Sequence, residues 1–137
     1  MTAFVLDCSV TMSWCFQDEA RAETDALLER LRDDGAIVPQ LWFWEVANVL
    51  NIAVRRGRID AVGASAQLGV LASLPITPDP EGVAQAWRET LRLAQAEGLT
   101  VYDASYLELA TRTGADLTTT DTDLRAAAVR CGVTVAP

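Results

Sequence analysis

The stretch Ala3-Phe4-Val5-Leu6-Asp7-Cys8-Ser9 joins a short apolar run to a carboxylate. Four consecutive apolar residues before a polar step are typical of a strand that is buried on both faces, as in the middle of a parallel sheet. Asp7 then follows the carboxyl end of that strand, the edge at which open α/β sheets bind ligands. Asp7 is therefore a candidate site residue, and the alternative is a turn residue after the strand.

The chain has 137 residues, of which 50% are hydrophobic, and this fits one globular domain over residues 1–137. No basic segment is followed by a long apolar stretch, so we expect a cytoplasmic protein without a membrane segment. The three cysteines are odd in number and form no C-x-x-C pair, which predicts reduced core residues.

The chain has no histidine and no lysine, and all 11 basic residues are arginine. Histidine bases, histidine-bound zinc, Schiff-base lysines and the P-loop lysine are therefore excluded, which leaves carboxylate chemistry. The net charge of −8 disfavours nucleic-acid binding through bulk charge, but a local arginine patch or bound cations remain compatible with it. Arg55, Arg56 and Arg58 form the densest basic segment, which is either a phosphate contact or a solvated helix end.

Periodicity and glycine or proline positions predict strands that alternate with helices. The expected helices span residues 17–34, 41–56, 59–74, 81–97, 103–113 and 121–131, and the expected strands lie near residues 3–6, 36–39, 76–77, 99–102, 116–120 and 133–135. Val83, Trp87 and Leu91 share the apolar face of the helix over 81–97. This alternation indicates an α/β domain with a largely parallel sheet.

Glu45 lies within the apolar arc of the helix over 41–56, together with Leu41 and Val49. A carboxylate on a buried face must be neutralised, paired or bound to a cation, because burying it bare is costly. Glu45 is therefore a site candidate. A rim position or a salt bridge to Arg56 would also explain it.

Asp103 shares the arc of Tyr106, whereas Glu108 and Arg112 form an i,i+4 pair on the opposite side of the same helix. This pattern predicts that Glu108 is a surface residue and that Asp103 is not. Helix N-capping is the other explanation for Asp103.

Asp121 and Asp123 follow the strand expected over 116–120, where helix capping explains either of them. However, Asp7, Asp103 and Asp121 all come at expected strand-to-helix junctions, which face one edge of a parallel sheet. Carboxylates gathered there raise each other's pKa unless divalent cations keep them ionised. Oxygen ligands of this kind suit Mg²⁺ or Mn²⁺.

Four short segments resemble the PIN-domain family, and the length and layout are similar to those of its VapC-type toxins from bacterial toxin–antitoxin pairs. These segments are Val5–Ser9, Glu45–Asn48, Tyr102–Leu107 and Thr118–Leu124, in this order along nearly the whole chain. The resemblance implies a three-layer PIN-like α/β fold, in which a short central parallel sheet is flanked by helices.

The resemblance also implies an endoribonuclease toxin that uses Mg²⁺ or Mn²⁺ and cleaves RNA phosphodiesters through a metal-activated water. The implied catalytic quartet is Asp7, Glu45, Asp103 and Asp121, with Asp123 as a further metal position and with Ser9 and Thr119 as supporting hydroxyls. We expect Asp7 and Asp103 to be the inner metal ligands, and the other two members to bind directly or through water. The partners implied are RNA, a small antitoxin and a second copy in a homodimer.

Other interpretations can be separated by residue. A phosphatase of the haloacid dehalogenase type would need an aspartate where Ser9 stands, and a receiver domain would need a lysine. A PIN-fold RNA-processing nuclease without an antitoxin stays open, as does an inactive metal-binding or protein-interaction module. Trp42 shares the arc of Glu45 and is expected in the core, whereas Trp44 points elsewhere, where it could stack bases or line an antitoxin groove.

Overall fold

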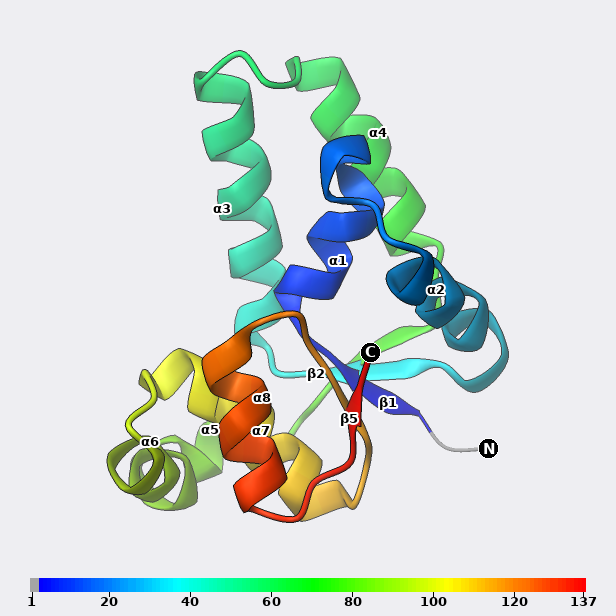
Figure 1. Ribbon diagram of the computed structural model, residues 1–137. Coiled ribbons are helices and arrows are strands. Elements are labelled where there is room, and N and C mark those ends of the chain that lie inside the picture. Colours follow the sequence, from blue (N-terminus) through cyan, green and yellow to red (C-terminus); the bar gives the residue numbers. More distant parts are fainter. Residues whose placement is uncertain (1–2) are drawn as a thin grey trace.

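Five short parallel strands form the centre of the computed structural model, which describes residues 3–137 (Figure 1). They are β1 (Phe4–Leu6), β2 (Ala36–Val38), β3 (Ile76–Pro78), β4 (Leu117–Thr118) and β5 (Val135–Ala136). Their order in the sheet is β3-β2-β1-β4-β5, and every neighbouring pair is parallel. The expected parallel sheet is confirmed, with the buried strand β1 in its middle.

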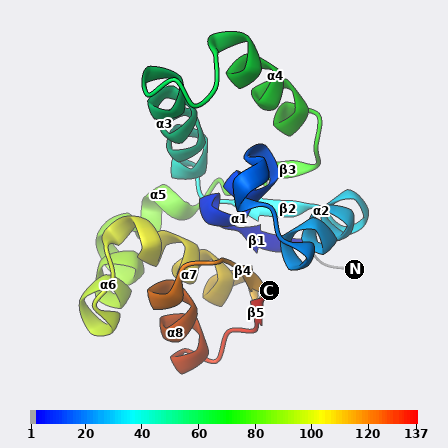
Figure 2. The same ribbon diagram turned by 45° about the horizontal axis from the view of Figure 1, so that its top comes forward.

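Helices cover both faces of this sheet, which gives three layers (Figures 1 and 2). One side carries α1 (Cys8–Cys15), α2 (Ala22–Asp34), α3 (Leu41–Arg55) and α4 (Ala61–Ala72), and the other carries α5 (Gly82–Gln85), α6 (Leu91–Glu97), α7 (Val101–Thr113) and α8 (Thr122–Arg130). A 3₁₀ turn over Gln17–Glu19 precedes α2, and a π-helical turn over Ala86–Thr90 joins α5 to α6. The three-layer α/β fold expected from the sequence is therefore confirmed.

Helix α1 is missing from the elements expected from the sequence. Its residues are almost all buried, because it packs against both α2 and α3, so it shows no alternation of apolar and polar faces. Trp42 of α3 is also buried, as expected, and its indole N–H donates to the Thr11 hydroxyl at 3.0 Å. Helix α1 starts directly after Asp7, so it fixes the direction in which the chain leaves β1.

The strand expected over 99–102 is wrong, because α7 already begins at Val101. The Thr100 hydroxyl caps this helix by accepting the backbone N–H of Asp103 at 3.0 Å. A β-branched, apolar run is typical of a strand, but a threonine three residues before a first-turn acid is also a helix start. Asp103 therefore lies in the first turn of a helix that follows another helix, and not at a strand end.

The apolar face expected over 81–97 is exposed rather than buried. Trp87 is 92% exposed and Val83 is 71% exposed, while Thr90 and Leu93 are buried instead, and Ala94 is the member of the expected face that is buried. The π-helical turn changes the number of residues per turn, so the helical phase before it does not continue after it. A patch of large apolar side chains is left on this surface.

Within residues 3–137, no helix combines the length and the apolar character that crossing a bilayer requires. The most apolar helix, α4, starts with the Asp60 carboxylate capping the backbone N–H of Gly63 at 2.7 Å. Of its residues only Leu71 is buried, so α4 packs against α3 along a narrow stripe.

Candidate active site

The strand register brings Asp7 and Thr119 together. Leu6 of β1 lies opposite Thr118 of β4, so the next residues of the two parallel strands leave the sheet at the same edge. The Thr119 hydroxyl donates to Oδ2 of Asp7 at 2.7 Å, and the Ser9 hydroxyl donates to the same oxygen at 2.7 Å. Burial raises the pKa of Asp7, and these two hydroxyls act in the opposite direction.

The same two hydroxyls also hold the chain that leads to Asp121. The Thr119 hydroxyl accepts the backbone N–H of Asp121, and the Ser9 hydroxyl accepts that of Thr120, each at 3.0 Å. Ser9 and Thr119 therefore tie the buried carboxylate of Asp7 to the loop between β4 and α8. Their supporting role at a catalytic site stays a prediction.

Glu45 lies on the inner side of α3 and is half-buried. Its Oε1 accepts a hydrogen bond of 2.5 Å from the hydroxyl of Tyr106, a side chain on α7 with no exposed surface. Burial raises the pKa of Glu45, and the charges of Asp7 and Asp103 raise it further, while the Tyr106 hydroxyl lowers it.

The partner of Glu45 is therefore not the arginine considered from the sequence. No salt bridge joins Glu45 to Arg56 within the described residues. Tyr106 shares the helical arc of Asp103, but its contact with Glu45 was not predicted from the sequence. Its position on a buried helical face could have predicted a polar partner, because a buried tyrosine hydroxyl usually finds a hydrogen-bond partner.

Asp103 is half-buried in the first turn of α7, and Thr100 rather than Asp103 caps this helix. The N-cap explanation for Asp103 is therefore wrong. Burial raises the pKa of Asp103, followed by the charges of Asp7, Asp121 and Asp123. The charges of the acidic residues expected at the site therefore reach one another, although these residues come from α3, α7, the start of α8 and the position after β1.

Asp121 is the N-cap of α8, where its Oδ2 accepts the backbone N–H of Leu124 at 2.8 Å. The capping explanation is confirmed for Asp121, and its charge reaches Asp7 and Asp103 as well. Asp123 is exposed in the first turn of α8 and lies at the outer side of the group.

The donor set at this edge fits a hard divalent cation. It consists of carboxylate and hydroxyl oxygens, and no arginine forms a salt bridge with Asp7, Glu45, Asp103 or Asp121 in the described part of the chain. Over residues 3–137, no three acidic or cysteine side chains are close enough to hold one ion together. An ion here would bind at most two carboxylates directly and complete its shell with water, as Mg²⁺ does in proteins.

Glu108 is buried, with only 2% of its surface exposed, so its expected surface position is wrong. The expected pair with Arg112 is present at 2.9 Å, and Arg112 also contacts Asp79 at 2.5 Å and Glu81 at 3.2 Å. Asp79 follows β3 and is equally buried. Helical spacing could not show that the loop after β3 covers this side of α7, which is why the pair is buried.

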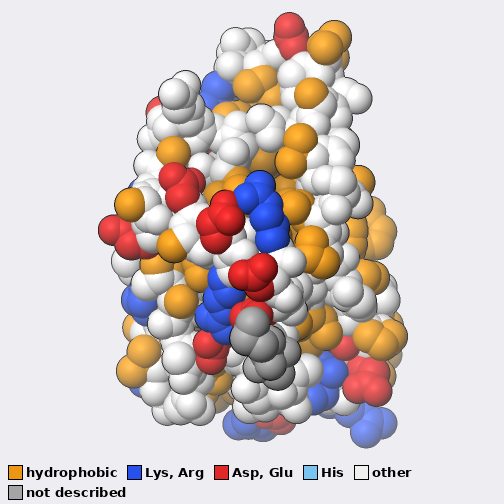
Figure 3. Space-filling view, turned by 90° about the vertical axis from the view of Figure 1, so that its right-hand side faces the viewer, with side chains coloured by type: hydrophobic (Ala, Val, Ile, Leu, Met, Phe, Trp, Pro, Cys, Tyr) orange, Lys and Arg blue, Asp and Glu red, His pale blue; other side chains and the backbone are white. Residues whose placement is uncertain are grey.

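The arginines at the end of α3 lie away from the acidic group. Arg55 comes ten residues after Glu45 in the same helix, which places it about 15 Å further along the axis. Arg58 donates to Asp18 and Glu19 and covers the ring of Phe16 at 3.8 Å. On the face shown in Figure 3, acidic and basic side chains lie next to one another. RNA binding by Arg55 and Arg56 stays a prediction, and Arg58 is engaged in ion pairs.

Comparison with known proteins identifies the family. The family model described as "PIN domain" matches residues 4–130, which includes every strand but the last and all of the acidic residues discussed above. The chain belongs to the PIN-domain family. The resemblance found in the sequence is thus confirmed, and it extends to proteins named as VapC.

One relative of this PIN-domain protein is "Exonuclease VapC9" from Pyrobaculum aerophilum, which is 40% identical over 87 residues. The match covers 63% of this chain and 62% of the length of that relative. A solved structure, PAE2754 from the same organism, is 30% identical, with a TM-score of 0.71 over 98% of this chain and 83% of the other.

Two more distant structures share the fold of this PIN-domain protein. VapBC2 from Rickettsia felis, solved with a DNA fragment from its promoter, has a TM-score of 0.67 at 11% identity and covers 98% of this chain and 97% of the other. FitAcB from Neisseria gonorrhoeae has a TM-score of 0.68 at 17% identity and covers 98% and 96%.

Proposed function

We propose that this PIN-domain protein is an endoribonuclease that requires Mg²⁺ or Mn²⁺ and serves as the toxin of a toxin–antitoxin pair. The observation that carries the proposal is the group of acidic side chains at the edge of the sheet. Asp7, Glu45 and Asp103 all have a raised pKa, and each feels the charge of at least one other member of the group. Such a group is unfavourable in itself, which is typical of sites that hold cations.

Each acidic residue has a role that its surroundings support. Asp7 and Asp103 hold the cation, Asp7 being fixed by the hydroxyls of Ser9 and Thr119. Glu45 is oriented by Tyr106 through Oε1, so its Oε2 remains free to take a proton from the water that attacks the phosphate. Asp121 completes the group, and Asp123 contributes charge at its rim. The cation, when bound, lowers the pKa of water and balances the charge of the phosphate.

A circular single-stranded RNA tests both the cleavage and its type. We expect the wild-type protein to convert circular RNA to linear products when Mg²⁺ or Mn²⁺ is present and to be inactive in EDTA. Asp7→Asn should abolish cleavage, while Asp33→Asn, at an exposed acid of α2, should leave it unchanged. Equal cleavage by wild type and Asp7→Asn contradicts the proposed site. Cleavage of linear RNA alone would instead make this protein an exonuclease, as the Pyrobaculum aerophilum relative is named.

A second copy and an antitoxin are the protein partners proposed. Exposed Trp87, Val83 and Leu91 form an apolar patch on α5, α6 and the π-helical turn, and patches of this kind often mark interfaces. Trp87→Ser should lower the sedimentation coefficient from that of a dimer to that of a monomer, and an unchanged dimer would exclude this patch. Co-expression with the product of the adjacent gene should suppress cleavage, whereas a processing nuclease without an antitoxin would be unaffected.

A further inference from the structure

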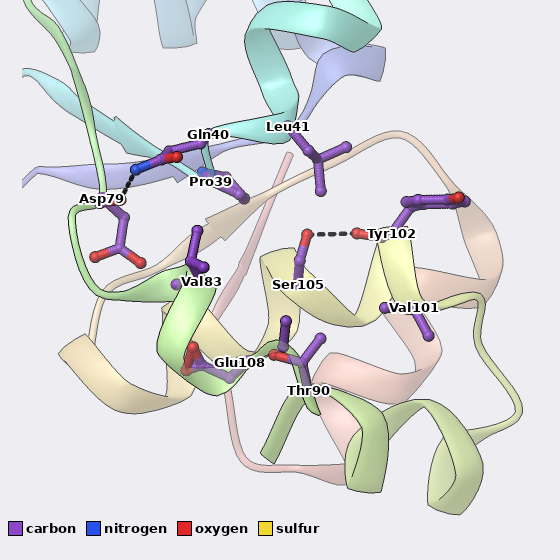
Figure 4. Close-up of a pocket in the computed structure, with 12 residues that line it drawn as sticks. Pro39, Gln40, Leu41, Asp79, Val83, Thr90, Val101, Tyr102, Ser105 and Glu108 are labelled. Carbon is purple, nitrogen blue, oxygen red and sulfur yellow. Dashed lines mark hydrogen bonds between the residues drawn. The ribbon is translucent and has the colours of Figure 1, made fainter. Parts of the chain in front are cut away.

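A groove of about 430 Å³ adjoins the acidic group on the side of α3 and α7. Its lining residues are Leu41, Trp44, Glu45, Asn48 and Tyr102. This volume is within the range of about 300–1,000 Å³ that is typical of small-ligand sites. Leu41 and Tyr102 also line a second, apolar pocket of about 210 Å³, in which Val83 and Val101 lie (Figure 4). Glu45 is the residue that the groove shares with the proposed active site.

Two exposed aromatic side chains line this groove, and each comes directly before an acidic residue in the sequence. Trp44 immediately precedes Glu45 in α3 and is 70% exposed, and Tyr102 immediately precedes Asp103 in α7 and is 66% exposed. Neither side chain is needed by the core, which contains Trp42 and Tyr106 instead. Large aromatic rings so exposed are costly to leave in water and usually have a binding role.

We propose that Trp44 and Tyr102 form a stacking subsite for one unpaired base of the RNA, next to the phosphodiester that is cut. This inference rests on the proposed nuclease function and names its substrate class, a single-stranded segment. Stacking on aromatic rings is the usual way in which proteins bind unpaired bases, and it tolerates different base identities. The amide of Asn48, one turn after Trp44 and Glu45, can donate to and accept from the base edge.

The composition of the groove favours a base over other parts of a nucleic acid. Its only charged lining residue is Glu45, so the groove repels a phosphate and offers the neutral ring a flat, apolar surface. A base inside a duplex is stacked on its neighbours and cannot enter such a groove without being splayed out. Single-stranded RNA is therefore the form that fits.

Binding of a fluorescein-labelled, single-stranded RNA of mixed sequence tests the subsite directly. Fluorescence anisotropy is measured in the Asp7→Asn background, which prevents cleavage during the titration. Trp44→Ala should weaken binding about 5- to 150-fold, the range measured for losing one stacked base. Trp44→Phe should retain most of the affinity, because it keeps an aromatic ring. The same strand annealed to its complement should bind more weakly and should respond little to Trp44→Ala.

Val62→Ala is the control, because Val62 of α4 is an apolar residue that is 79% exposed and does not line the groove. We expect it to leave RNA affinity within twofold of the parent. RNAs that each carry one abasic residue at a different position should reveal the contact. At the position that stacks on Trp44, the missing base should weaken binding to the parent protein. The same RNA should bind to Trp44→Ala no more weakly than the intact RNA does.

Three results would overturn the subsite. The first is equal RNA affinity in the parent and in Trp44→Ala. The second is an equal loss in Trp44→Leu and Trp44→Phe. The third is conversion of a dimer to a monomer by Trp44→Ala, with a loss of RNA affinity no larger than the loss of dimer explains. A second copy of the chain would then occupy the groove. If Trp44→Ala binds and cleaves RNA normally, only the subsite is rejected; if wild type neither binds nor cleaves RNA, the proposed function is rejected with it.

Discussion

Arg112 neutralises two buried carboxylates, so its removal is expected to destabilise the protein strongly. The side chains of Asp79 and Glu108 are each 3% exposed, and both contact the guanidinium of Arg112. In Arg112→Met the packing volume is largely kept, but two buried negative charges lose their partner. Removing one partner of a buried ion pair typically costs about 3–5 kcal/mol. With an unfolding entropy of about 2.1 cal/mol/K per residue over 137 residues, this lowers Tm by about 10–17 °C.

Thermal unfolding followed by circular dichroism, together with urea titration, measures this loss. The matched control is Arg92→Met, because Arg92 pairs with Glu89 at the surface and is 62% exposed. Surface pairs contribute about 0–1 kcal/mol, so the control should lower Tm by at most about 3–4 °C. If Arg112→Met is no less stable than Arg92→Met, Arg112 does not neutralise the buried carboxylates of Asp79 and Glu108.

Further predictions concern the acidic group and the cysteines. Tyr106→Phe removes a hydrogen bond that lowers the pKa of Glu45, so the acidic limb of kcat/KM should move to higher pH, and an unmoved limb would exclude Tyr106 as the residue that positions Glu45. Asp103→Asn should abolish cleavage yet stabilise the fold. The pKa of Asp103 is raised in the folded protein, so the ionised carboxylate destabilises the fold as the pH rises through that pKa. The increase in the free energy of unfolding, measured by urea titration, should therefore vanish below about pH 3.9, where the carboxyl is protonated in both states. Glu108→Gln should instead lower Tm while cleavage by the folded fraction persists; a loss of cleavage without a loss of Tm would give Glu108 a direct role. Of the three free cysteines only Cys131 is not buried, so a thiol reagent should label one cysteine rapidly in the native protein and three in urea, and rapid native labelling of all three would contradict the packing of α1.

The elements that the sequence predicted well are those with a clear local pattern. Strand β1 lies within the apolar run of residues 3–6, which ends at a carboxylate, and α3 has one apolar arc, so both are found where they were expected. Helix α1 was missed because it is buried nearly all round, and a helix without a polar side has no period to detect. The face around Trp87 was expected to be buried but is exposed, because spacing identifies an apolar face but not whether another element covers it.

The candidate site could be proposed from the sequence because acidic residues are conspicuous on buried arcs and at strand ends. The inner positions of Glu45 and Asp103 followed from helical spacing alone. The contacts that orient these residues could not be predicted, because they join segments far apart in the chain. Tyr106 reaches Glu45 across 61 positions, and Thr119 reaches Asp7 across 112. The parallel register of β1 and β4 sets the contact between Thr119 and Asp7, and neither segment alone predicts this register.

The two hydroxyls around Asp7 determine how many of its oxygens a ligand can use. Ser9 and Thr119 both donate to Oδ2, so Oδ1 is the oxygen without a side-chain donor. In the proposed cation site, Asp7 would therefore coordinate through one oxygen. Ca²⁺ readily accepts bidentate carboxylates and a variable shell, whereas Mg²⁺ demands an octahedron of single oxygens and water. In the proposed site, discrimination between these two ions would thus begin with the alignment of two neighbouring strands.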